Sequence, residues 1–187
     1  MGTISYGMSV SLDGYIESPN DHTWSIPDEE LHRHFNDLEE ATDIFLYGRG
    51  MYEVMAGYWP TVEDDSPVSG PEIEYARIWK PKPKIVFSTT LEHVGWNSQL
   101  VKENMAEEIQ RLKAQPGLTM SVGGAALAAS LMEPGLIDEY RLYVHPVILG
   151  GGKPMFPQLR AKIGLQLAET QTFGSGVVLL RYQRAAE

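Results

Sequence analysis

The sequence predicts an α/β protein with a mixed, mostly parallel sheet, helices on both faces and an antiparallel hairpin at the C-terminus. Short apolar segments alternate along the chain with segments of helical periodicity, a pattern typical of parallel strands joined by right-handed helical crossovers. The last two apolar segments are separated only by a turn at Gly174 and Gly176, which is too short for a crossover, so these strands must pair antiparallel. With 187 residues and no shift in composition, we expect one domain over residues 1–187.

Local patterns predict the individual elements. The first strand is rich in β-forming residues and ends at an Asp13-Gly14 bend, and the first helix begins with Ser25, Pro27 and a group of acidic residues. Glycine and proline end most of the other segments. In chain order we expect a strand from residue 3 to the bend, a helix at 25–41, a strand at 43–48, a helix at 49–57, a loop or lid at 58–71, a helix at 72–80, a strand at 84–91, a helix at 98–117, a strand at 118–122, an alanine-rich helix that ends before Pro134, a strand at 137–149, a glycine-rich turn at 150–156, and strands at 165–174 and 176–184.

Composition and charge exclude several classes of protein. Apolar residues make up 43% of the chain and charged residues 21%, the balance of a globular protein rather than a disordered one. The net charge of −10 argues against a nucleic-acid partner. The absence of cysteine excludes disulfides, thiolate nucleophiles and Cys-ligated zinc. The N-terminal segment has neither a basic region nor a long apolar stretch, so we expect a cytoplasmic protein with no membrane partner.

Three predicted strands end in small or hydroxyl-bearing residues, in FLYGRG (45–50), VFSTT (86–90) and SVGGAA (121–126). Helix N-termini at such ends present unpaired N–H groups, which suit phosphate. Arg49 adds a permanent cation, and Ser88 and Thr89 add hydroxyl donors. Together they could hold a ligand with phosphates at two places, as NADP has. Alternatively, the glycines make tight turns and Arg49 pairs with Glu53 on its own helix.

The adjacent glycines Gly123 and Gly124 have two explanations. Either the helix packs closely on the sheet, or a phosphate lies against the bare backbone. The segment is not a Rossmann fingerprint, because the third glycine and the acidic partner are missing, and GGGK at 150–153 is not a P-loop, because Pro154 replaces the Ser or Thr. The five histidines are scattered, so we expect no metal site.

Four segments carry a resemblance to a known family: SLDGYI, LYGRGMYE, IVFSTTL and VGGAALAASLMEPGLIDEYRLYVHPVILGGGKPMF. Their order and spacing resemble the dihydrofolate-reductase-like family, and in particular the reductase domain of the bifunctional deaminase–reductase of riboflavin biosynthesis and its small stand-alone relatives. The resemblance covers nearly the whole chain. It implies a dihydrofolate-reductase-like three-layer fold, NADPH bound in an extended pose, and a homodimer. The deaminase activity is not expected, since its zinc signature requires cysteines.

The resemblance also implies which residues contact the cofactor. The pyrophosphate would lie on Gly123, Gly124, Ala125 and Ala126; the adenosine 2′-phosphate region would lie among Gly48, Arg49, Ser88 and Thr89; and the nicotinamide ring would border Gly7, Met8 and Ile16. Met51 stands where the family usually has a threonine that helps to hold phosphate, which weakens the preference for NADPH over NADH.

The expected reaction is NADPH-dependent reduction of a small heterocycle, similar to 5-amino-6-(5-phosphoribosylamino)uracil. His145 ends a strand where the family faces its substrate, and Asp13 follows the first strand; either is a candidate proton donor, and either is explained equally well by a structural hydrogen bond or a turn. The other candidates for substrate contacts are Trp24, Trp59, Gly150 and Gly151, although both tryptophans would serve equally as core.

Two alternative functions stay open. The first is pterin or dihydrofolate reduction. Dihydrofolate reductase holds its pterin with a carboxylate on the first helix, whereas the acids Asp28, Glu29 and Glu30 at the start of this helix are explained by the helix dipole. The second is a nucleotide-binding module that keeps the cofactor cleft without chemistry.

Overall fold

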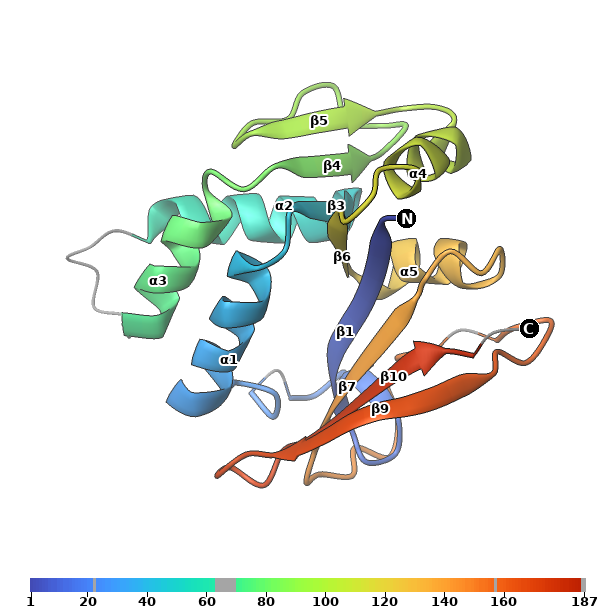
Figure 1. Ribbon diagram of the computed structural model, residues 1–187. Helices are drawn as coiled ribbons and strands as arrows, with labels where there is room; N and C mark the ends of the chain where they lie inside the picture. The colour runs from blue at the N-terminus through green and yellow to red at the C-terminus, as the bar shows by residue number, and fades with distance from the viewer. Residues whose placement is uncertain (22, 63–69, 157, 186–187) are drawn as a thin grey trace.

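The computed structural model describes residues 1–21, 23–62, 70–156 and 158–185 (Figure 1). The strands are β1 (Thr3–Ser11), β2 (Tyr15–Glu17), β3 (Ile44–Gly48), β4 (Lys84–Phe87), β5 (Ser98–Val101), β6 (Thr119–Gly123), β7 (Glu139–His145), β8 (Lys153–Pro154), β9 (Leu165–Thr172) and β10 (Val178–Arg184). The helices are α1 (Glu29–Glu40), α2 (Arg49–Tyr58), α3 (Gly70–Trp79), α4 (Met105–Lys113) and α5 (Ala125–Met132), with a short 3₁₀ helix at Trp59–Thr61.

Eight strands form one sheet in the order β5-β4-β3-β6-β1-β7-β10-β9. Neighbouring strands from β5 to β7 pair in parallel, whereas the β7–β10 and β10–β9 pairs are antiparallel. The predicted mixed sheet and the C-terminal hairpin are therefore confirmed. The carboxyl ends of β3, β4 and β6 lead into α2, a loop and α5, so the glycine-containing strand ends lie along one edge of the sheet.

Helices cover both faces of the sheet. On one face, α4 and α5 bury a core that includes Ile4, Tyr6, Ile109 and Leu131. On the other face, α2 and α3 pack over β3 and β4, whereas α1 packs over β7 and β10. Figure 1 shows α1 and α3 together on one side of the central strands and α4 and α5 on the other, which gives the three layers that the resemblance implied.

The side chains of β1 determine where a cleft can form. Successive residues of a strand point to opposite faces, so Ile4, Tyr6 and Val10 enter the core, whereas Ser5, Gly7 and Ser9 face α1 and α3. Because these side chains are small, they do not fill the space between the helices and the sheet. The middle of this face is consequently hollow.

The structure corrects the predicted helix at 98–117. Residues Ser98–Val101 form β5, which pairs in parallel with β4, and the helix begins only at Met105. The helix pattern extended backwards into SQLV because its Leu and Val also fit a helical face. Pairing at the free edge of β4 decides the conformation instead, and Asn104, in a left-handed conformation with φ of 56°, separates the strand from the helix.

Other differences are smaller. Part of the predicted glycine-rich turn forms β8, which pairs antiparallel with β2. The predicted lid at 58–71 begins at the last residue of α2, continues through the 3₁₀ helix and ends inside α3. Its residues 63–69 lie outside the described part of the chain. No helix within the described ranges is both long enough and apolar enough to cross a membrane.

Candidate active site

A polar pocket lies at the carboxyl ends of β3, β4 and β5. It has a volume of about 430 Å³ and brings together the predicted residues Arg49, Ser88 and Thr89. Nη1 of Arg49 donates to Oγ1 of Thr90 at 3.3 Å, while its Nε lies 3.8 Å from the Glu53 carboxylate. The predicted pairing with Glu53 is therefore present, and it still leaves the guanidinium at the pocket.

The donor set of this pocket fits a phosphate-bearing group. Oγ of Ser88 accepts the backbone N–H groups of Thr90 and Leu91 at 3.2 and 3.0 Å, which shapes the turn after β4. Lys102, which follows β5, adds a second cation to the lining. Sequence reasoning missed Lys102 because it treated the β5 segment as part of a helix.

The glycine pair at the end of β6 lies beside α2. A Cβ atom at Gly123 would come 2.6 Å from Cδ1 of Tyr47 and 3.1 Å from Cγ of Met51, so packing alone requires glycine there. Gly124 has a φ of +94° and is the N-cap of α5, so its conformation also favours glycine. Ala125 and Ala126 form the first turn of α5, whose N–H groups face the same edge of the sheet.

A cleft of about 690 Å³ opens on the face of β1 that carries Ser5, Gly7 and Ser9. Its remaining lining comes from the helices and from β6 and β7: Met8, Ile26, Pro27, His32, Phe35, Leu38, Glu39, Tyr58, Trp59, Glu72, Tyr75, Ser121, Arg141 and Tyr143. Two aromatic pairs stand in it, with ring centroids 4.7 Å apart for Phe35 and Tyr143 and 4.4 Å apart for Trp59 and Tyr75. The cleft has the volume and the flat apolar surfaces that suit a small planar molecule.

Glu39 is the acid at the inner end of this cleft. It lies on the last turn of α1, and Oγ of Ser121 donates to its Oε1 at 3.4 Å. Burial raises the pKa of the Glu39 carboxyl to about 7, against the opposing effects of Arg141, Ser121 and Lys82. A carboxyl with such a pKa exchanges protons near neutral pH and can either accept an N–H group or donate a proton.

Arg141 on β7 is the register partner of Gly7 on the neighbouring parallel strand β1. Its Nε donates to Oε1 of Glu139 at 2.6 Å, and Oε2 of the same glutamate accepts from Nη1 of Arg181 at 3.0 Å. Nε of Arg181 in turn donates to Glu169 at 2.8 Å. The arginine at the cleft is thus one member of an ion-paired network across β7, β10 and β9.

Asp13 holds a loop together. Its carboxylate accepts the backbone N–H groups of Leu149 and Gly150 at 3.1 and 2.7 Å and the hydroxyl of Ser11 at 2.7 Å. The hydrogen bond from Ser11 is the main cause of its lowered pKa. Such a carboxylate stays ionised near neutral pH, which suits a structural anchor better than a proton donor.

His145 lies beneath Trp24, outside the residues that line the cleft. The two rings make an edge-to-face contact with centroids 5.4 Å apart, and the histidine is 5% exposed. Its buried Nε2 has no hydrogen-bond partner among the described residues, and burial lowers the pKa of the imidazole. The ring is therefore neutral near pH 7.

The other predicted site residues lie in four different places. Gly7, Met8 and Trp59 line the cleft, and Gly48 caps α2 at the polar pocket's edge. Ile16 is buried in the core on the opposite face of the sheet. Gly150 and Gly151 belong to the loop held by Asp13.

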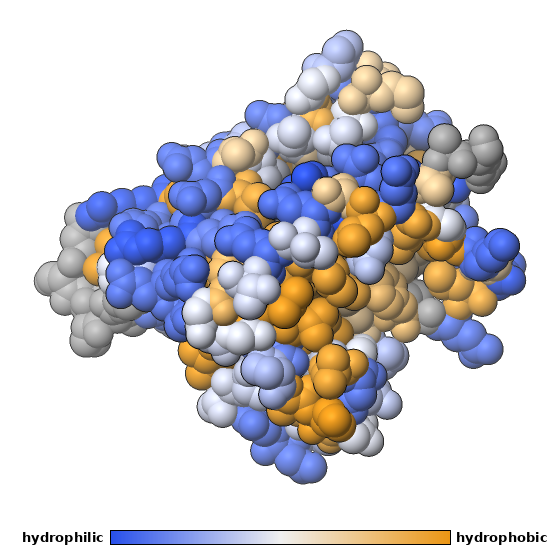
Figure 2. All heavy atoms as spheres, turned by 60° about the horizontal axis from the view of Figure 1, so that its bottom comes forward, coloured by the Kyte–Doolittle hydropathy of each residue, from blue (hydrophilic) through white to orange (hydrophobic). Residues whose placement is uncertain are grey.

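Figure 2 brings forward the end of the molecule at which β1 and β7 finish, where hydrophobic side chains gather among hydrophilic ones.

Sequence reasoning missed most of the polar residues of the cleft, among them His32, Glu39, Glu72, Ser121 and Arg141. One signal was available, because Arg141, Tyr143 and His145 alternate along β7 and therefore share a face. Glu39 had no signal of its own, since a glutamate near the end of an amphipathic helix usually faces solvent. Its position follows from the small residues on β1 and β6, which leave room below the helix.

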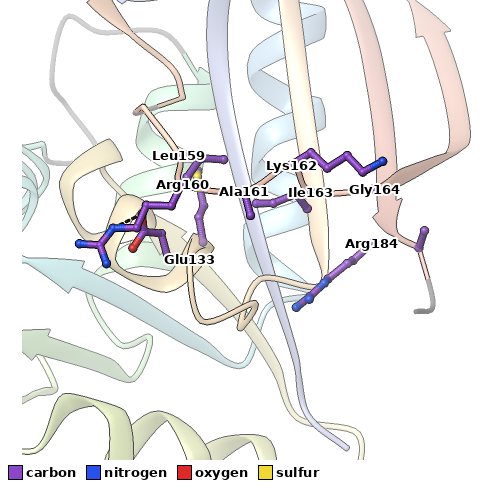
Figure 3. Close-up of a pocket in the computed structure, with 10 residues that line it drawn as sticks. Glu133, Leu159, Arg160, Ala161, Lys162, Ile163, Gly164 and Arg184 are labelled. Atoms are coloured by element: carbon purple, nitrogen blue, oxygen red, sulfur yellow. Dashed lines mark ion pairs between the residues drawn. The ribbon is translucent and has the colours of Figure 1, made fainter.

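A further hollow lies at the opposite edge of the sheet, beside the end of β10 (Figure 3). It has a volume of about 520 Å³ and is lined by residues 159–164, the end of α5 and Arg184. Nε of Arg160 lies 3.8 Å from Oε1 of Glu133 at one end of the hollow. The dashed line in Figure 3 marks this ion pair. None of the predicted site residues lies there.

The order of the strands relates the polar pocket to the cleft. The pocket lies at β3, β4 and β5, the glycine pair ends β6, and the cleft opens on β1, the next strand along. This arrangement defines a protein of the dihydrofolate-reductase-like class. Dihydrofolate reductase from Enterococcus faecalis, solved with NADP(H), superposes with a TM-score of 0.62 at 14% identity, covering 98% of this chain and 97% of that one.

The family model "RibD C-terminal domain" matches residues 3–179, so the chain belongs to this family. Among individual proteins, YyaP of Bacillus subtilis strain 168, described as uncharacterized, is 37% identical over 180 residues, which cover 94% of this chain and 91% of YyaP. YwjB of the same strain, also described as uncharacterized, is 31% identical over 187 residues and 98% of each chain.

The solved structures agree on the fold. A putative riboflavin biosynthesis protein from Shewanella sp. PV-4 gives a TM-score of 0.77 at 23% identity, covering 98% of this chain and 99% of that one. The deaminase and 5-amino-6-(5-phosphoribosylamino)uracil reductase of Thermotoga maritima gives 0.67 at 14% identity, covering 98% of this chain and 57% of the larger protein. This chain thus corresponds to one part of that bifunctional protein.

Proposed function

We propose that this protein is an NADPH-dependent reductase of a small heterocyclic substrate, similar in reaction type to the uracil reductase named for the Thermotoga protein. The observation that carries the proposal is that three features follow one another on neighbouring strands of the sheet. A pocket with Arg49 and Lys102, the start of α5 and the cleft beside Gly7 follow one another across neighbouring strands. Membership of the RibD C-terminal domain family supports the same reading.

The chain's own residues have distinct parts in this proposal. Arg49 and Lys102, with the hydroxyls of Ser88 and Thr89, would hold the phosphate at the adenosine end of the cofactor. Gly7 and Met8 would border the nicotinamide, which supplies the hydride when NADPH is bound. The aromatic pairs would orient a planar substrate, and Glu39 would accept or donate a proton at its edge.

Two measurements test the proposal. Thermal unfolding with NADPH tests binding, because a ligand at a hundred times its Kd adds about 2.7 kcal/mol to the free energy of unfolding. Loss of NADPH absorbance with pyrimidine, pterin, nitro and carbonyl compounds then tests turnover. A protein that binds NADPH and reduces none of them would be the non-catalytic module, and a protein that does not bind it would refute the proposal.

Pterin reduction is the second candidate function, and one observation favours it. Helix α1 does place a carboxyl in the cleft, although it is Glu39 near the end of the helix and not one of the acids at its start. Oxidation of NADPH with dihydropterin or dihydrofolate, in the absence of turnover with pyrimidines, would select this candidate.

A further inference from the structure

A tyrosine and a histidine form a hydrogen-bonded pair on the β7 side of the cleft. Oη of Tyr143 on β7 lies 3.0 Å from Nε2 of His34 on α1. Tyr143 is 3% exposed and lines the cleft, whereas His34 is half-buried and is not among the described residues of the lining. The pair therefore connects the cleft with a partly exposed side chain outside it.

The Tyr143 hydroxyl has hydrogen-bonding capacity left for a ligand. A tyrosine hydroxyl can both donate and accept a hydrogen bond. Within the described part of the chain, the contact with His34 is the only hydrogen bond that this hydroxyl makes. Phe35 holds the ring in an edge-to-face contact with centroids 4.7 Å apart. A molecule bound against Tyr143 can therefore supply the second partner of a hydroxyl whose position is fixed by packing.

Tyr143 also stands beside the residue that would border the nicotinamide. A Cβ atom at Gly7 would come 3.8 Å from Cε2 of Tyr143, the ring carbon next to the one that bears the hydroxyl. Both residues line the cleft from neighbouring strands. Glu39 lies on the other side of β1, because it accepts its hydrogen bond from Ser121 on β6. Two groups that can carry a proton thus flank β1 on opposite sides.

Both members of the pair are uncharged near neutral pH. Burial raises the pKa of the Tyr143 hydroxyl, and burial together with Arg141 lowers the pKa of the His34 imidazole. The charged groups that act on Tyr143 are Arg141, Glu39, Glu139 and Glu169, and those that act on His34 are Arg141, Asp37 and Glu169. The tyrosine therefore keeps the proton that a donor must have, and Arg141 is the cation that would stabilise the anion left behind.

We propose that Tyr143 donates the proton that accompanies hydride transfer, and that His34 returns a proton to it from outside the cleft. The inference rests on the proposed reductase function, and it assigns this proton to Tyr143 rather than to Glu39. The substrate is then a compound with a C=N or C=O double bond. The carbon of that bond accepts the hydride as NADPH becomes NADP⁺, and its nitrogen or oxygen takes the electron pair of the double bond and the hydroxyl proton of Tyr143. The tyrosinate then takes the Nε2 hydrogen of His34, while Nδ1 of His34 binds a proton from water.

The proposal requires one particular tautomer of His34. The tyrosine hydrogen is free for a substrate only if Nε2 of His34 carries a hydrogen and donates it to Oη, because a bare Nε2 would accept the tyrosine hydrogen instead. NMR of the histidine nitrogens, with and without NADP⁺, distinguishes these states, and the His34 signals are identified by their loss in His34→Gln. We expect hydrogen on Nε2. A bare Nε2 would overturn the inference without any measurement of turnover.

Turnover of named probes tests the proton donation itself. The probes are dihydrofolate, benzaldehyde and 5-amino-6-(5-phosphoribosylamino)uracil, and the variants are compared on the probe that the wild type reduces fastest. Tyr143→Phe should lower kcat about a hundredfold or more, the usual contribution of a general acid, and leave the KM of the probe and the Kd of NADPH within about twofold. His34→Gln should lower kcat about tenfold, because the amide can still donate to Oη but cannot pass a proton on.

Tyr140→Phe is the matched control, because Tyr140 is 2% exposed on the same strand but belongs to the core on the opposite face of the sheet. His93→Gln, at an exposed residue, is the control for the histidine. Both controls should keep the wild-type kcat.

Wild-type kcat in Tyr143→Phe, or an equal loss in Tyr140→Phe, would overturn the inference. Either result leaves the reductase proposal standing, since the wild type still oxidises NADPH. If the wild type reduces none of the three probes, the inference fails together with the proposed function.

Discussion

Gly123 on β6 lies directly against the ring of Tyr47 on β3. A Cβ atom at Gly123 would come 2.6 Å from Cδ1 of Tyr47, much closer than two non-bonded carbon atoms can approach. The ring cannot easily move away, because Tyr47 is 4% exposed and its hydroxyl accepts a hydrogen bond from Nε1 of Trp79 at 3.2 Å. The first glycine of the pair is therefore explained by packing between neighbouring strands.

We expect Gly123→Ala to lower the free energy of unfolding by about 1–3 kcal/mol, the usual cost of overpacking a core. Gly57→Ala is the matched control, because Gly57 lies in α2 with open space around its Cβ position. That change should stabilise the protein by about 0.5–1 kcal/mol through helix propensity. Denaturant unfolding measures both, and a neutral Gly123→Ala would contradict the packing explanation.

Gly124 is a poor site for testing phosphate contact, since its φ of +94° strains any other residue, so we place the cofactor test at Arg49. We expect Arg49→Gln to weaken NADPH binding about tenfold, the effect of losing a hydrogen bond to a charged group, and to leave NADH binding unchanged. Calorimetry with both nucleotides measures this. Arg160→Gln, which alters an exposed ion-paired arginine far from the pocket, is the control. Equal losses for both nucleotides would remove Arg49 from phosphate recognition.

Glu39 should make stability depend on pH. Burial raises its pKa from 4.5 to about 7, with Arg141 and Lys82 acting against the shift, so between these values the folded protein binds more protons than the unfolded chain. The free energy of unfolding from this group therefore falls as pH rises from 4.5 to 7. Above pH 7, Glu39→Gln should be the more stable protein by on the order of 2 kcal/mol, and near pH 4.5 the difference should vanish.

Denaturant unfolding across this pH range measures the effect, with Glu40→Gln as the control that should follow the wild type. Parallel stability curves for Glu39→Gln and the wild type would show that the Glu39 carboxyl is solvated like an ordinary surface group.

His145 should act on stability rather than on turnover. Because burial lowers its pKa, the folded protein takes up its proton at a lower pH than the unfolded chain, so stability from this group is lost as pH falls below the ordinary pKa of histidine. His145→Phe keeps the edge contact with Trp24 and removes that dependence. We expect its kcat to stay close to wild type and its unfolding curve to flatten at acid pH. A large fall in kcat with unchanged NADPH affinity would instead restore His145 as the proton donor.

We predict that a homodimer forms through the edge strand β9. It is the last strand of the sheet, and Leu165 and Leu167 are 38% and 51% exposed on it. An exposed strand edge with apolar side chains favours pairing with a second chain. We expect sedimentation to show a dimer for the wild type and a monomer for Leu167→Lys. Val54→Lys, at an exposed apolar residue of α2, should remain dimeric, and a monomeric wild type would refute the prediction.

The sequence alone determined the α/β class, the C-terminal hairpin and the strand ends that carry Arg49, Ser88 and the glycine pair. These features depend on local signals: hydrophobic periodicity, turn residues and the length of connections, which act within a few residues of the chain. The local signals gave a wrong prediction at residues 98–101, whose pattern fits both a helix and a strand. There the unpaired edge of β4 favoured a strand over the start of a helix.

Tertiary structure decided which of the polar residues share a site. Glu39, Ser121 and Arg141 are far apart in the sequence and meet only because β1 lies between β6 and β7 and presents small residues to the cleft. The same packing brings Gly123 against the ring of Tyr47 and lets Asp13 accept hydrogen bonds from a loop. It also places His145 in contact with the ring of Trp24. The burial of a side chain, and with it the pKa of a group such as Glu39, depends on all the elements packed around it, so no local pattern of residues can specify it.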